Sequence, residues 1–410
     1  MRLRPGRTLG PLLALLLLLA AAAPVEALTV RGRVLDAGGH PLAGAYVSDG
    51  VGITQSAPDG AFLLESQAGR VVALTAPPGH GDGPRWWWPA EQAAQIGEFR
   101  LGPAKPGGAE SLPLVVLSDP HLYDASAAPT WSGKLDPTVP LRAWQKTMAE
   151  LKALRPALTL VLGDLAMDAE KGQPAYGRAQ MGLARRAAAL LPAPWRACPG
   201  NHDVRYGPHG VDYSLWREFL GPVRSLSFAG PVAVLLLDNT GISTRQDGTP
   251  RPCGILPQEA LDWLKAALAL LPPETPLLVG SHYPLASPLA GVNPLRKGSL
   301  VRAPGPTGLG LRNVDQNGVR AMTLLAARPL VGLLSGHLHA ANRSALLGRQ
   351  ATVPLWGAPA LCGRWWQGDM NYGPIGFPPA YMRGALRRGP AGWSLELGQV
   401  VITPPAQPRP

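Results

Sequence analysis

Short clusters of histidine, aspartate and asparagine are the parts of this chain best suited to chemistry, and five of its eight histidines lie in them. Carboxylate, amide and imidazole groups are donors that borderline divalent cations accept, and a pair of such ions needs about seven of them. The clusters supply that number, so they predict a centre for two metal ions. In chain order they are Asp119-Pro120-His121, Gly163-Asp164, Gly200-Asn201-His202-Asp203, His282 and Gly336-His337-Leu338-His339.

His202 is predicted to have a role other than that of a metal ligand. It follows Asn201 directly, which places it within reach of the metals without being needed as a ligand. Such a histidine suits a general acid that protonates a departing oxygen, and Asp203 is predicted to hold its ring. Two cations about 3.5–4 Å apart activate a water as hydroxide and offset the charge of a phosphate. The predicted reaction is therefore hydrolysis of a phosphoester without a protein nucleophile.

The elements that must position these residues are visible as apolar runs. Runs at 114–117, 158–162, 277–279 and 330–334 each end just before a cluster, and short apolar runs of this kind indicate buried strands. A further run occupies 232–237. Between the runs, apolar residues recur every three or four positions over 141–154 and 261–271, which predicts helices. Alternating strands and helices indicate an α/β core, with the clusters at the carboxyl ends of its strands.

The five clusters resemble the motifs of the calcineurin-like metallophosphoesterase family, which run D-x-H, G-D-x-x, G-N-H-D, a lone His and G-H-x-H in this order. The resemblance implies an α-β-β-α layered sandwich over 113–345. It also implies two divalent ions (Mn, Fe, Zn or Co) that activate a hydroxide for attack on a small phosphomonoester or phosphodiester. One ion would be bound by Asp119, His121 and His339, the other by Asn201, His282 and His337, with Asp164 bridging the two.

Composition divides the rest of the chain. Residues 1–27 carry three arginines, a leucine-rich run and a short polar end, which predicts a signal peptide and a periplasmic or secreted protein with no membrane span after its removal. Residues 28–103 are predicted to form an all-β sandwich domain and 104–112 a linker. Residues 346–410 are predicted to form a small β-rich accessory domain. These flanking parts resemble those of a secreted multidomain subfamily of the same family.

Net charge is +11, from 38 basic and 27 acidic residues. Since no dense run of lysine or arginine occurs, biased composition explains this charge better than a stable nucleic-acid partner does. Cys198, Cys253 and Cys362 allow at most one disulfide, and a Cys253–Cys362 pair is possible. The consecutive tryptophans 86–88 either stack on a ligand or pack against the neighbouring domain.

Three other functions deserve comparison. A purple acid phosphatase would have a tyrosine three residues after the bridging aspartate, where this chain has Met167. A nuclease acting on extracytoplasmic nucleic acid predicts a basic cleft with stacking aromatics and a strong salt dependence. A non-catalytic binding protein would have no reason to keep the complete set of donors.

Overall fold

The computed structural model describes residues 26–104, 109–127, 138–167, 169, 174–207, 210–244, 250–288, 313–347, 352–363 and 378–402. The proposed signal segment lies outside these residues except for its last two positions. The interval 104–112, predicted as a linker, is described at its two ends, and β10 already begins within it.

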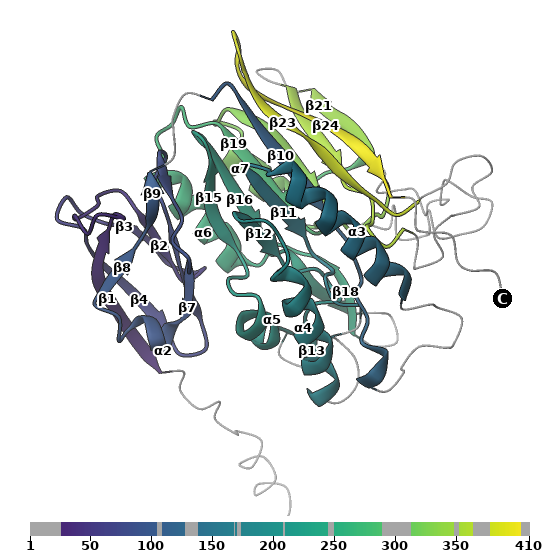
Figure 1. The fold of residues 1–410 in the computed structure, drawn as a ribbon, viewed down its shortest axis with the longest axis horizontal. Coiled ribbons are helices and arrows are strands. Elements are labelled where there is room, and N and C mark those ends of the chain that lie inside the picture. The colour runs from purple at the N-terminus through teal and green to yellow at the C-terminus, as the bar shows by residue number, and fades with distance from the viewer. Residues whose placement is uncertain are drawn as a thin grey trace, which may run out of the picture.

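Two sheets form the centre of the molecule (Figure 1). In the first, with the order β12-β11-β10-β23-β24, strands β10 to β12 are parallel and β23 and β24 are antiparallel. Its strands are β10 (Ser111–Leu117), β11 (Leu158–Leu162), β12 (Trp195–Cys198), β23 (Ala380–Gly389) and β24 (Gly392–Val401). The second has the order β15-β16-β19-β20-β22-β21. Its strands are β15 (Ser225–Ala229), β16 (Val232–Leu237), β19 (Leu277–Ser281), β20 (Leu330–Ser335), β21 (Asn342–Leu347) and β22 (Thr352–Gly357).

Alternate side chains of the central strands point to opposite faces of each sheet, one toward the other sheet and one toward the helices. Leu114 and Val116 of β10 belong to a core cluster shared by both sheets, while Val115 and Leu117 contact helices on the outer side. Successive strand residues point to opposite faces, so one strand serves both contacts. The helices are α3 (Thr138–Leu154) and α4 (Pro174–Ala188) on the first sheet, and α6 (Gln258–Leu270) and α7 (Gly318–Leu325) on the second. The layers are therefore helix, sheet, sheet and helix, in the mixed α/β class that was predicted.

The C-terminal segment corrects one expectation. Residues 346–410 were expected to form a separate accessory domain, but their described strands belong to the two central sheets. β23 pairs with β10 from Ser111 to Val116, and β22 pairs with β20. Met382, Leu386 and Leu395 lie in the core between the sheets. Without this segment one edge of β10 would keep unpaired backbone groups beside an open core, so a domain boundary at 345 is physically unfavourable.

The N-terminal segment has a core of its own, which includes Val30, Phe62 and Val72. Its two main sheets have the orders β4-β1-β8 and β3-β2-β5-β7 (Figure 1). The strands are β1 (Ala27–Leu35), β2 (Tyr46–Ser48), β3 (Ile53–Gln55), β4 (Ala61–Gln67), β5 (Val71–Thr75), β6 (His80–Gly81), β7 (Trp87–Pro89), β8 (Glu98–Arg100) and β9 (Gly102–Ala104), with a short helix α2 (Ala90–Ala93). We call this segment the N-terminal module.

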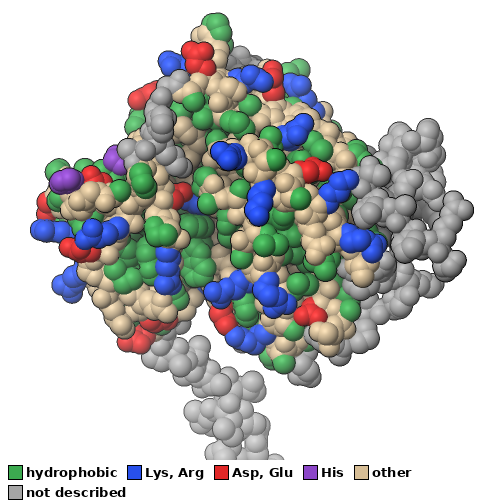
Figure 2. All heavy atoms as spheres, in the orientation of Figure 1, with side chains coloured by type: hydrophobic (Ala, Val, Ile, Leu, Met, Phe, Trp, Pro, Cys, Tyr) green, Lys and Arg blue, Asp and Glu red, His purple; other side chains and the backbone are tan. Residues whose placement is uncertain are grey.

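Smaller elements complete the described part of the chain. Two hairpins pair β13 with β14 and β17 with β18. The bounds are η1 (Ala125–Ala127), β13 (Arg205–Gly207), β14 (Gly210–Asp212), α5 (Ser214–Phe219), β17 (Thr240–Thr244) and β18 (Pro250–Gly254). None of the described helices combines the length and the hydrophobicity needed to cross a membrane. Basic side chains are scattered among neutral and apolar ones on the face shown in Figure 2.

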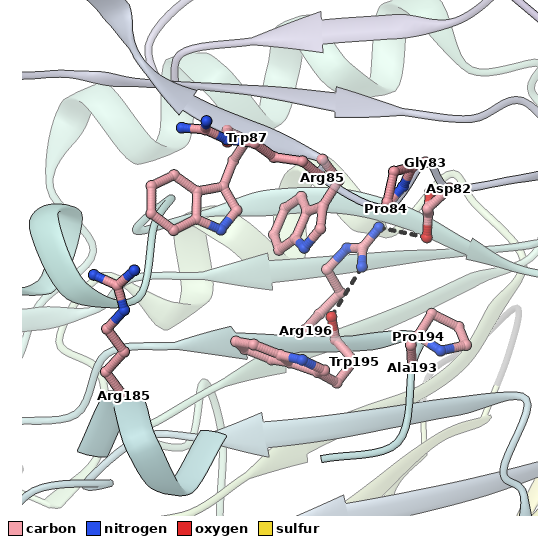
Figure 3. A pocket seen from close by; sticks show the side chains of 11 residues that line it. Asp82, Gly83, Pro84, Arg85, Trp87, Arg185, Ala193, Pro194, Trp195 and Arg196 are labelled. Atoms are coloured by element: carbon pink, nitrogen blue, oxygen red, sulfur yellow. Dashed lines mark hydrogen bonds and ion pairs between the residues drawn. The ribbon is translucent and has the colours of Figure 1, made fainter. Parts of the chain in front are cut away.

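The three consecutive tryptophans pack within the protein. The guanidinium carbon of Arg196 lies over the ring of Trp86, 3.9 Å from the ring centroid. Arg196 in turn donates to Asp82 Oδ2 at 2.8 Å (Figure 3). Trp87 lies against Gly221, and Trp88 belongs to the core of the N-terminal module. A cavity of about 630 Å³ lies between residues 82–87 of the N-terminal module and, on the side of the first sheet, Arg185 of helix α4 and residues 193–196 at the start of β12. The alternative of packing against the neighbouring domain therefore accounts for Trp86 and Trp87.

Arg224 belongs to a buried ion pair beside the second sheet and also binds the N-terminal module through a hydrogen bond. Arg224 donates to both carboxylate oxygens of Asp238, at 2.5 and 3.0 Å, and to the carbonyl oxygen of Gly50 at 2.7 Å. Thr75 Oγ1 also donates to the carbonyl oxygen of Leu226 at 2.6 Å. Both charges of the ion pair are almost completely buried. Arg224 also lies 3.1 Å from Oε1 of the partly exposed Glu259, whereas Asp238 has Arg224 as its direct ion-pair partner among the described residues, so removal of Arg224 leaves a buried carboxylate uncompensated.

An Arg224→Ala variant should lose about 3–5 kcal/mol of unfolding free energy, because Asp238 is left buried without its partner. The control is Arg178→Ala, since Arg178 pairs with Glu218 at the surface, where both side chains are about half exposed, and it should lose much less stability. Denaturant unfolding of the two variants measures the difference. Equal losses would contradict the importance of the buried pair.

Candidate metal centre

All seven predicted metal donors follow the carboxyl ends of parallel strands. Asp119 and His121 follow β10, Asp164 follows β11, and Asn201 follows β12. In the second sheet, His282 follows β19, and His337 and His339 follow β20. β10, β11 and β12 are parallel to one another, as are β19 and β20, so their loops gather at one edge of each sheet. The structure brings all seven side chains together there.

One half of the centre consists of Asp119, His121 and His339. The Nε2 atoms of the two histidines lie 3.1 Å apart, and Asp119 Oδ1 lies 3.1 Å from His339 Nε2. Asp119 Oδ1 is buried and accepts no hydrogen bond from the described residues. Two donors bound to one ion at about 2.1 Å and at right angles lie about 3 Å apart, so these spacings fit ligands of a common cation.

The other half consists of Asn201, His282 and His337. His282 Nε2 lies 3.0 Å from Asn201 Oδ1, and the rings of His282 and His337 have centroids 5.1 Å apart. Asp164 lies between the halves, because its Oδ2 atom is 3.6 Å from His121 Nε2 and 3.2 Å from His282 Nε2. A single carboxylate oxygen thus faces donors of both halves, the arrangement that a bridging ligand requires.

Each aspartate uses its two oxygens differently. Asp119 Oδ2 accepts hydrogen bonds from the Ser118 hydroxyl and from the backbone N–H of His337, the latter at 3.0 Å. Asp164 Oδ1 accepts the backbone N–H of His202 at 2.8 Å. The remaining oxygens point at histidine nitrogens. His282 Nδ1 lies 2.8 Å from the carbonyl oxygen of Leu162, which it can bond only as a donor, so Nε2 is left for a metal.

Electrostatics favour ionised aspartates in this buried place. Burial raises the pKa of Asp164, but the charges of His282 and His202 outweigh it and leave the pKa well below its usual value. Burial lowers the pKa of His121 to about 3 despite the charge of Asp164. Near neutral pH Asp164 is therefore a carboxylate and His121 an unprotonated imidazole, the forms that bind cations. Burial lowers the pKa of His282, but the charge of Asp164 outweighs it and raises that pKa to about 9, so a cation bound there must displace the proton of the ring.

The backbone at the donors is strained. Six described non-glycine residues have positive φ, and five of them are predicted metal donors: Asp119, His121, Asp164, His337 and His339, with φ of 51, 46, 53, 65 and 56°. The left-handed conformation costs about 1 kcal/mol or more for such residues, and clusters of it occur at functional sites. The surrounding fold therefore holds the donors in a conformation that they would not adopt alone.

Two motif glycines allow the loops to approach each other. A β-carbon at Gly336 would lie 2.8 Å from Asp119 Oδ2, and one at Gly200 would lie 2.8 Å from Asp164 Cγ. Such contacts are too short for carbon against these atoms. The glycines beside the donors are thus required by the packing of one loop on another.

His202 lies at the junction of the two halves. Its ring meets the ring of His121 edge to face, with centroids 4.9 Å apart, and its nitrogen lies within 4.8 Å of donor atoms of His121 and Asp164. Asp203 accepts backbone N–H groups of Ala166 and Gly200, at 2.8 and 2.9 Å. These bonds fix the loop that carries Asn201 and His202. That Asp203 holds the His202 ring stays a prediction.

Three neighbours of the donors were missed by the sequence analysis. Ser118 donates to Asp119, Asn313 Oδ1 lies 3.4 Å from His337 Nε2, and the ring of Tyr283 lies 3.9 Å from that of His337. Ser118 and Tyr283 are each adjacent to a donor in the sequence, which is the only signal that could have found them. Asn313 lies 24 residues from His337 and carries no such signal.

The segment of Asn313 is fixed by Asp315, whose Oδ1 accepts the N–H groups of Leu256 and Asn317 at 3.2 and 2.8 Å. Burial, aided by the charge of Asp238, raises the pKa of Asp315 to about 6. Between about pH 4 and pH 6 the unfolded carboxyl group is ionised while the folded one keeps its proton. This group therefore makes stability fall as the pH rises through that window.

An Asp315→Asn variant keeps an oxygen for both N–H groups but does not titrate. The difference in unfolding free energy, variant minus wild type, should increase by up to about 3 kcal/mol between about pH 4 and pH 7, because only the wild type loses stability there. Denaturant unfolding of both proteins across this range tests it. A stability difference that does not change with pH would refute the assignment.

The cysteines are reduced and buried in the structure, so the possible Cys253–Cys362 disulfide is not formed. Cys198 is the last residue of β12 and lies in the core between the sheets.

This chain is similar in sequence to known proteins. Residues 112–341 match the calcineurin-like phosphoesterase family, which is more than half of the chain. A curated relative, the 3',5'-cyclic adenosine monophosphate phosphodiesterase CpdA of Escherichia coli K12, is 28% identical over 232 residues, 55% of this chain and 69% of the relative. The chain belongs to the calcineurin-like phosphoesterase family. It is accordingly a hydrolase that acts on phosphoester bonds.

Two solved structures match this chain at low sequence identity and with TM-scores below 0.5. A dimetal phosphatase from Danio rerio is 12% identical, with 71% of this chain and 99% of that chain covered and a TM-score of 0.42. A protein named as a putative 5'-nucleotidase from Staphylococcus aureus is 13% identical, with 72% of this chain and 55% of that chain covered and a TM-score of 0.38.

Proposed function

We propose that the protein is a two-metal phosphodiesterase that hydrolyses a small phosphodiester, with His202 as the general acid. The observation that carries this proposal is the position of Asp164 Oδ2 between His121 and His282, which divides the donors into two adjacent sets. The relative CpdA is named for cleavage of a cyclic nucleotide diester, which favours a diester over a monoester.

The residues have separate roles in this proposal. When bound, the two divalent ions supply an activated water and offset the negative charge of the phosphate. Asp119, His121 and His339 would hold one ion, Asn201, His282 and His337 the other, and Asp164 both. The His202 ring, beside His121 and only partly buried, protonates the leaving oxygen. Asp203 and the Ser118 hydroxyl keep the donor loops in place.

The proposed location is the periplasm or the cell exterior. It is supported by the arginines and the leucine-rich run of residues 1–27. Sequencing the N-terminus of the protein isolated from its native cells tests this, with a start near residue 28 expected and an intact Met1 contradicting it.

Hydrolysis assays after metal removal and reloading test the activity. Protein loaded with Mn, Zn or Co should hydrolyse bis(p-nitrophenyl) phosphate at least about tenfold faster than p-nitrophenyl phosphate, and chelation should abolish both reactions. 3',5'-cyclic AMP is the natural diester to test first. Activity unaffected by chelation, or a clear preference for the monoester, would contradict the proposal.

The same assays separate the nuclease alternative. A nuclease would degrade single-stranded DNA or RNA with a rate that falls steeply with salt, because phosphate contacts release counterions. A small diester should be hydrolysed with little dependence on salt.

A further inference from the structure

Cys362 lies against the half of the centre that contains His121 and His339. Its side chain is completely buried, and its Sγ and ring nitrogens of the two histidines all lie within 4.8 Å of one another. Cys198 and Cys253 belong to no comparable group among the described residues. A soft sulfur donor therefore stands beside one ion position and not the other.

Backbone hydrogen bonds tie this thiol to the donor loop. Leu361 N–H donates to the carbonyl oxygen of Ser118 at 2.9 Å, and Cys362 N–H donates to that of Asp119 at 3.3 Å. The segment after β22 thus runs beside the loop after β10 and carries Cys362 with it. Because Asp119 is itself a donor, the position of Sγ relative to the ion site is set by the same backbone.

The surroundings of Cys362 are apolar. Tyr123, Met167, Tyr176 and Ala360 form a small buried cluster around it. A thiolate is costly in such a place unless a cation offsets its charge, and a neighbouring metal does so directly. The protonated thiol donates to the carbonyl oxygen of Gly363 at 3.1 Å, and this hydrogen bond is lost when the thiol gives up its proton.

We propose that Cys362 is a thiolate ligand of the ion held by Asp119, His121 and His339, in addition to the bridging Asp164. As the sulfur–metal bond forms, the thiol proton passes to solvent, and no oxidant or reductant takes part. Thiolate selects zinc, iron and cobalt over manganese and magnesium, so this half of the centre is the selective one. The inference rests on the proposed two-metal function.

The test is the spectrum of the cobalt-loaded protein. Wild-type protein with two Co²⁺ per chain should show a sulfur-to-cobalt charge-transfer band in the near ultraviolet. Cys362→Ser should lose the band, and its selectivity for zinc over manganese, measured by competition and elemental analysis, should fall at least about tenfold. Cys253→Ser is the matched control, since Cys253 is also buried but lies in β18, and it should keep both properties.

Each outcome decides the proposal. Absence of the band in wild-type protein that holds two Co²⁺ overturns it without any variant, so a folding defect in Cys362→Ser does not matter. A band that persists in Cys362→Ser also overturns it. A wild-type band lost only in Cys362→Ser, without hydrolysis of any phosphodiester, would uphold the ligand and refute the proposed function instead.

Discussion

An Asp164→Ala variant should bind fewer than two metal ions per chain and lose more than about a thousandfold in kcat/KM. The reason is the position of its Oδ2 atom, which faces His121 in one half of the centre and His282 in the other. Removing it takes away the only described carboxylate that both halves share. Elemental analysis and diester hydrolysis measure the two effects together.

The matched control is Asp124→Asn. Asp124 lies three residues after His121, but its carboxylate accepts from Ser126 and faces Arg186, away from the donors. This variant should keep both metals and full activity. Metal-dependent hydrolysis retained by Asp164→Ala at the wild-type rate would rule out the bridge.

A His202→Ala variant should keep both metals and lose about 10²–10⁴ in kcat for a diester with an alkyl leaving group. A p-nitrophenolate group leaves as the anion and needs no proton, so hydrolysis of the aryl diester should fall much less. This difference between two substrates separates a general acid from a metal ligand, whose loss would slow both reactions.

The control for His202 is His40→Ala, because His40 is exposed in the N-terminal module and pairs with Asp36. Its metal content and both rates should equal those of the wild type. If His202→Ala slows the alkyl and the aryl substrates equally, or loses metal, the acid role is wrong.

The predicted donors could be identified from the sequence because each motif directly follows the apolar run that predicts its strand. An apolar run such as 158–162 predicts β11 with the observed bounds, and Gly163-Asp164 follows it directly. Parallel strands then place all such loops at one edge. No knowledge of the register between distant strands was needed to predict that the clusters meet.

The remaining features depend on contacts between distant segments. β23 joins β10 across more than 260 residues, and nothing in the composition of 380–389 distinguishes a sheet edge from a separate domain. Arg224 meets Gly50 across 174 residues. Cys362 was seen only as a possible disulfide partner, because its distance from the histidines is set by the pairing of its segment with the loop after β10.

The positive φ angles at five donors also bear on how this centre can decay in descendants that no longer need it. Once selection for catalysis ends, drift should favour glycine, asparagine and aspartate at Asp119, His121, Asp164, His337 and His339, because these residues tolerate that conformation. Valine and isoleucine should be rare there. Inactive descendants would then carry a recognisable bias at these places, left by the shape of the chain after its chemistry has gone.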